Sequence, residues 1–130
     1  MSMSDFTEDL VLDWLLTNGA ATRPTAWYVG LYTAAPSDTG GGTEVSGNGY
    51  VRQAVTFTVS GTNPTTATNN AQIDFPAATG SNWGTITHAA IFDAETTGNM
   101  LWWGALSASK VINVGDIFRF PAGDIDLTLD

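Results

Sequence analysis

His88 is the only histidine of the chain, and histidine is the side chain best suited to proton transfer near neutral pH. In a hydrolase with a Ser-His-Asp triad His88 would act as the base, with Asp93 close by in the sequence. However, His88 lies in a stretch predicted to be a strand, and no Gly-x-Ser-x-Gly motif occurs that would expose a nucleophilic serine. We therefore expect no catalytic residue and no enzymatic activity, and a His88 side chain packed or hydrogen-bonded on a sheet face.

Three further groups of residues have types that could bind a ligand. The glycine-rich run Gly40–Thr43 lacks the Gly-Lys-Ser/Thr sequence of a phosphate-binding loop. Asp124 and Asp126 are expected on one face of a strand, where their oxygens suit Ca²⁺, but no Asp-x-Asp-x-Asp-Gly loop surrounds them. Asp93 and Glu95 are an equally weak acidic pair. We expect neither a metal ion nor a cofactor.

Trp102 and Trp103 are adjacent in a predicted strand, so their rings point to opposite faces of the sheet. One ring can fill the core, while the other must lie under a loop, find a partner or remain exposed. Exposed aromatic rings mark interfaces, or platforms for flat ligands such as sugars. The alternatives are coverage within the fold, subunit packing and sugar binding. Trp83 is expected to close one end of the β-domain.

Composition limits the class of protein. At 130 residues the chain is expected to form a single domain, 1–130, and its 43% hydrophobic residues indicate a folded protein. A net charge of −9 repels phosphate, which argues against nucleic acid as a partner. The absence of cysteine excludes disulfides and zinc–thiolate sites. No apolar run approaches the ~20 residues that span a bilayer, and the acidic N-terminus is unlike a signal peptide. We expect assembly in the cytoplasm and no membrane partner.

Residues 1–19 are predicted to form a helix or arm. Asp5 and Glu8 could form a capping box, and Asn18-Gly19 could end the helix. Apolar residues recur at helical spacing on one face, opposite Asp9 and Asp13: Phe6, Leu10, Val11, Trp14 and Leu15. This face could pack on the sheet of its own subunit or dock on a neighbour. Our interface candidates are Phe6, Leu10 and Trp14 of the helix together with Trp102 and Trp103.

From residue 24 onward the chain alternates short strands with turns. The predicted strands cover 27–33, 50–59, 70–75, 85–93, 99–106, 110–114, 117–120 and 124–129. Turn signals at roughly ten-residue spacing are typical of an antiparallel β-sandwich. We therefore predict a mainly β fold, a jelly-roll-like antiparallel sandwich with one N-terminal amphipathic helix. The segments 34–48 and 61–69 are predicted to be long flexible loops.

Several motifs together resemble a family of small virion structural proteins of tailed phages. They are the aromatic stretch and glycine-rich loop of Arg23–Phe57, then Asp74–Ala78, Trp83–His88, Ile91–Asp93 and Val114–Asp116. Members are head decoration (cement) proteins, and are often labelled phage tail fibre proteins. The resemblance covers most of the chain.

The resemblance implies a structural virion protein. The role that it implies first is that of a capsid decoration protein. Such a protein would bind the major capsid protein on the outer shell, stabilise the shell and form a homotrimer. The alternative is a tail fibre or tail-tip component with a structural or receptor-binding role. A glycan-active enzyme would need two facing carboxylates about 5–9 Å apart in a cleft, and no such pair is recognisable in the sequence.

Overall fold

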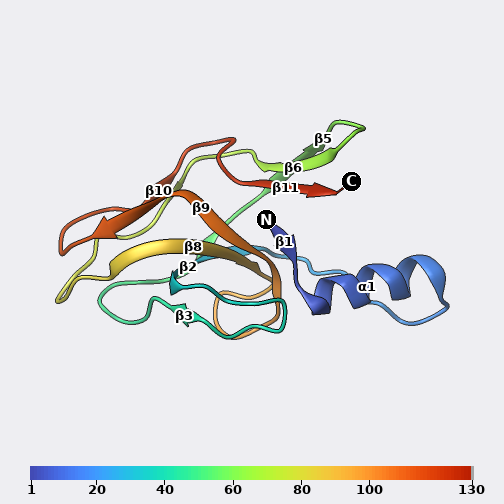
Figure 1. Cartoon of the computed structure of the whole chain (residues 1–130), viewed down its shortest axis with the longest axis horizontal. Coiled ribbons are helices and arrows are strands. Elements are labelled where there is room, and N and C mark those ends of the chain that lie inside the picture. Colours follow the sequence, from blue (N-terminus) through green and yellow to red (C-terminus); the bar gives the residue numbers. More distant parts are fainter. Residues whose placement is uncertain (130) are drawn as a thin grey trace.

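The computed structural model describes residues 1–129, which form one α-helix and three antiparallel sheets (Figure 1). The largest sheet has six strands. Its order is β1 (Ser2–Met3), β9 (Met100–Ile112), β8 (Gly84–Phe92), β2 (Tyr28–Ala34) and β3 (Thr43–Glu44), and β4 (Gln53–Ala54) also pairs with β2. The predicted mainly β, antiparallel fold with one N-terminal helix is confirmed. This strand order does not show the jelly-roll topology.

Two smaller sheets lie over one face of the large sheet. One pairs β7 (Ile73–Asp74) with β10 (Arg119–Phe120), and the other has the order β11 (Asp126–Leu129), β6 (Thr65–Asn69), β5 (Phe57–Ser60). The main core lies between the layers, because its buried side chains come from all three sheets and their connections. Leu31 and Ile86 of the large sheet are fully buried there, together with Phe75 and Ile125 from the opposite side.

Helix α1 (Asp5–Leu16) begins and ends differently from the prediction. Ser4, not Asp5, is the N-cap, and its hydroxyl accepts a hydrogen bond from the backbone N–H of Thr7. The predicted stop at Gly19 is also wrong: Thr17 is the C-cap, its N–H donates to the carbonyl of Asp13, and Gly19 has no positive φ. Within residues 1–129, no helix has the length and apolarity needed to span a membrane.

The segments predicted to be loops contain strands. Residues 61–69 include β6, which pairs with β5 on one side and with β11 on the other. Residues 34–48 include β3, which pairs with β2. The strands predicted at 99–106 and 110–114 join in one strand, β9, whose register with β8 shifts between Ile86 and His88. Residues 94–98 lie in the hairpin loop between β8 and β9.

Candidate assembly surface

The residues first considered for chemistry have structural roles. His88 lies on β8, where its Nδ1 shares a hydrogen bond with the Thr87 hydroxyl (2.8 Å). Asp93 accepts bonds from the backbone N–H and the side-chain amide of Asn99, which closes the hairpin loop. Asp126 accepts from the Thr68 hydroxyl across two paired strands. Within the described part of the chain, no cluster of three or more metal-ligating side chains occurs.

Trp102 and Trp103 point to opposite faces and are both half-buried. Trp102 packs against the main core, and Trp103 packs against a second cluster that contains Tyr32 and Phe92. The indole Nε1 of Trp103 donates to the Asp38 carboxylate (2.8 Å), so a loop partly covers this ring. Both rings are thus partly covered by their own fold.

Trp83 closes one end of the core, as expected. Its side chain is buried, its indole N–H donates to the carbonyl of Asn48 (2.9 Å), and its ring packs edge-on against Tyr50. This bond attaches the loop at Asn48 to the start of β8 in the large sheet.

A partly buried ion pair joins Arg52, in the loop before β4, to Glu44 of β3, and Arg52 also bonds to the hairpin loop after β8. Arg52 donates to both carboxylate oxygens of Glu44 (2.7 and 2.8 Å), and its third nitrogen donates to the carbonyls of Ala94 and Thr97 (3.0 and 2.7 Å). Its guanidinium lies 3.4 Å from the ring centroid of Phe92. Burial lowers the pKa of Arg52, but the bonds and charge of Glu44 outweigh this effect and raise the pKa above its usual value.

Two tyrosines complete this cluster. The Tyr50 hydroxyl donates to Glu44 (2.8 Å) and accepts from the backbone N–H of Leu31 (2.9 Å). Burial, and next the charge of Glu44, raise the pKa of Tyr32 to about 12 and raise that of Tyr50 further. Gly30 is required beside them, since a Cβ there would lie 2.8 Å from a Glu44 oxygen. This cluster was not predicted from the sequence, although the lone Arg52 after the glycine-rich loop was a signal for it.

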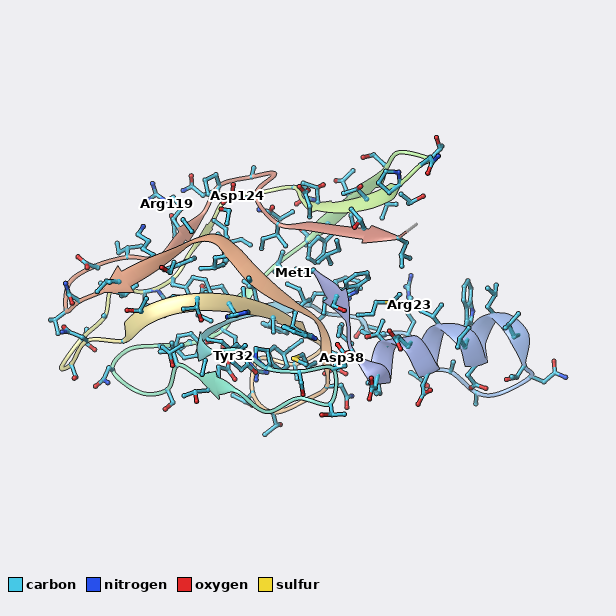
Figure 2. All side chains as sticks on the ribbon, viewed as in Figure 1. Met1, Arg23, Tyr32, Asp38, Arg119 and Asp124 are labelled. Atoms are coloured by element: carbon cyan, nitrogen blue, oxygen red, sulfur yellow. The ribbon has the colours of Figure 1, made fainter. Side chains whose placement is uncertain are left out.

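The base of α1 is attached firmly to the large sheet. Ser4 donates through its hydroxyl to the carbonyl of Met100, and its backbone N–H donates to that of Leu101 (3.0 Å). The Thr7 hydroxyl also donates to Leu101 (2.8 Å), and the N–H of Asp5 donates to the carbonyl of Asp38 (3.1 Å). Figure 2 shows Asp38 at this base. Thr7 is the only buried residue of the helix.

Beyond this base, α1 extends away from the β-domain (Figure 1). Its apolar side chains are largely exposed: Phe6 39%, Leu12 55%, Trp14 70%, Leu15 64% and Leu16 72%. Leu10 and Val11 are half-buried and, with Trp14, line a shallow apolar depression beside Ala21 and Arg23 of the returning chain. We refer to α1 as the helical arm.

The structure therefore separates the five interface candidates into two groups. Phe6 and Trp14 are exposed on the helical arm and Leu10 lies between them, whereas Trp102 and Trp103 are held within the β-domain. Sequence reasoning did not include Leu12 and Leu16, which are exposed on another side of the helix. A helix that is apolar on more than one side is normally covered by other protein, so the arm is the strongest candidate for an assembly surface.

A protein-family model matches almost the whole chain. The family model described as "Podophage GP4 fiber I protein gp80" matches residues 2–128. None of the curated proteins compared with the chain matches it.

Proposed function

The chain belongs to the podophage GP4 fiber I protein gp80 family, and we propose that it is a tail fibre subunit joined to its neighbour in the virion through the helical arm. Family membership makes it a structural, non-enzymatic protein of a phage virion and supports the tail-fibre alternative better than the cement interpretation. The observation that carries the role of the arm is the exposure of Leu12, Trp14, Leu15 and Leu16 on a helix whose base alone is attached.

A structural role fits the β-domain better than receptor binding. Receptor binding through an aromatic platform would need Trp102 or Trp103 in the open, and both rings are half-buried against core clusters. The partly buried pair of Arg52 and Glu44 ties the loops at positions 44–52 to the hairpin loop 94–98. A domain tied together in this way suits a rigid building block.

The expected homotrimer stays part of the proposal. A surface separate from the arm is available for self-association, since Val111, Val114 and Ile117 are about half exposed. They lie at the C-terminal end of β9 and just after it, at the end of the molecule opposite α1 (Figure 1). Light scattering on the purified protein should give three times the mass of one chain, and Val111→Ser/Val114→Ser should lower that mass. The mass of a single chain for the unaltered protein would contradict the trimer.

The fibre role can be tested with phage particles assembled without this protein. We expect such particles to retain their DNA on heating as well as complete particles do, and to adsorb poorly to host cells. Adding back the purified protein should restore adsorption. Earlier DNA release on heating, together with normal adsorption, would support the cement interpretation and contact with the major capsid protein instead.

A further inference from the structure

The helical arm carries acidic residues on both sides of its exposed leucines. Leu12 and Leu16 lie four residues apart and thus on one side of the helix. Glu8 precedes Leu12 by one turn, and Asp9 and Asp13 lie three residues before Leu12 and Leu16. With Asp5 the helix has four carboxylates, and it has no basic residue. The exposed surface is therefore an apolar ridge beside the exposed carboxylates of Glu8 and Asp9, whereas Asp13 is half-buried and accepts a bond from the Thr17 hydroxyl.

A second copy of this chain is a poor match for that ridge. The chain has four basic residues and a net charge of −9, so a second copy offers few cations that could face the carboxylates of the arm. Arg52 is paired with Glu44, and Arg119 is paired with Asp74. Lys110 lies over the ring of Phe118 (5.7 Å), and Arg23 lies beside the arm of its own chain. Four carboxylates of one arm would thus find few cations on another copy.

We propose that the helical arm docks into an apolar groove rimmed by lysine and arginine residues on a different virion protein. This inference rests on the proposed function and specifies the partner of the same arm. Leu12, Leu15 and Leu16 enter the groove, and the exposed carboxylates of Glu8 and Asp9 pair with the cations at its rim. Burial of the leucines supplies most of the affinity, while charge complementarity selects the partner and the orientation of the helix.

The experiment uses the full-length protein and purified phage particles assembled without it. Binding is measured for the unaltered chain, for Leu12→Ser/Leu16→Ser, and for Glu8→Gln/Asp9→Asn. Glu95→Gln/Asp124→Asn is the matched control, because it removes the same two charges from exposed positions outside the arm. The leucine variant should lose binding. The Glu8/Asp9 variant should bind about tenfold more weakly at low salt, and the control should bind normally.

Salt and mass measurements complete the test. Raising the salt concentration should weaken binding of the unaltered chain to the particles. The affinities of the unaltered chain and of the Glu8/Asp9 variant should then become more similar. A second outcome is loss of binding in the leucine variant with no effect of salt or of the Glu8/Asp9 substitutions. That result would contradict the basic rim of the groove but not the fibre role. If Leu12→Ser/Leu16→Ser lowers the mass of the free protein, the occupant is a second copy and the inference is wrong. Binding located on the capsid shell would instead overturn the proposed function.

Discussion

Arg52 connects parts of the chain that are far apart in sequence. Its guanidinium bonds to Glu44, to the carbonyls of Ala94 and Thr97, and lies over the ring of Phe92. A charged side chain that is 8% exposed is tolerated because every nitrogen has an acceptor. Removing the arginine would leave the Glu44 carboxylate without its cation.

We therefore expect Arg52→Met to lower the free energy of unfolding by about 1–3 kcal/mol, the cost of leaving partly buried acceptors without their charged donor. Urea denaturation followed by tryptophan fluorescence measures it. Arg119→Met is the control, since Arg119 is paired with Asp74 at the surface and both are half-exposed, so little change is expected. Equal losses in the two variants would contradict the importance of the partly buried pair.

The buried Tyr32 hydroxyl makes the free energy of unfolding decrease at alkaline pH. Its pKa is raised to about 12 by burial and by Glu44, against about 10 in an unfolded chain. The folded chain therefore holds this proton more tightly, and stability must fall as the pH rises from 10 to 12. Tyr32→Phe should reduce that fall, as measured by urea denaturation at several pH values. The same pH dependence in both proteins would contradict the raised pKa.

The helix shows where local sequence rules succeed and where they fail. Its existence follows from the spacing of Phe6, Leu10 and Trp14, and it does occupy residues 5–16. Its N-cap was placed one residue late, because Ser4 gains a further bond to Met100 that only the folded sheet supplies. Ser4 and Asp5 are both good N-cap residues, and the contact of Ser4 with the sheet determines which of them is the N-cap.

Ser4→Ala should loosen the arm without disturbing the β-domain. The substitution removes the N-cap and the bond to Met100, and loss of such a cap alone costs about 1 kcal/mol. Hydrogen exchange should speed up in residues 5–16 and stay unchanged in β8 and β9. Thr17→Ala, at the other end of the helix, should have a smaller effect. Unchanged exchange in α1 of the Ser4 variant would show that its base is held by other contacts.

Strands were predictable from sequence where a residue pattern marked them. The alternating or bulky residues of β2, β8 and β11 made them recognisable. In contrast, β6 is Thr-Thr-Ala-Thr-Asn, whose threonines favour a strand but whose low apolar content gives no alternating pattern. It is a strand because β5 and β11 pair with both of its edges. That long-range pairing cannot be read from the five residues themselves.

In the candidate site, too, local patterns could be predicted from the sequence and long-range contacts could not. Phe6, Leu10 and Trp14 were found from helical spacing, but their exposure depends on where the helix lies relative to the sheets. Leu12 and Leu16 were missed because a pattern with one apolar face assumes that the other faces meet water. The position of Trp103 under the Asp38 loop could not be predicted either, since 65 residues separate the two.

In the whole molecule, a packed β-domain has a helix at one end and exposed aliphatic side chains at the other (Figure 1). The β-domain is tied together by a shared core and by the Arg52 cluster. The helical arm contributes little to that core, since Thr7 is its only buried residue. This division suits a subunit in which one part keeps its shape and another part joins a neighbour.

Electron cryomicroscopy of intact particles tests the central claim most directly. We expect density for the β-domain within a tail fibre, with α1 covered by a neighbouring protein whose basic side chains lie close to Glu8 and Asp9. Density for this protein on the outer capsid shell, with fibres that lack it, would contradict the account.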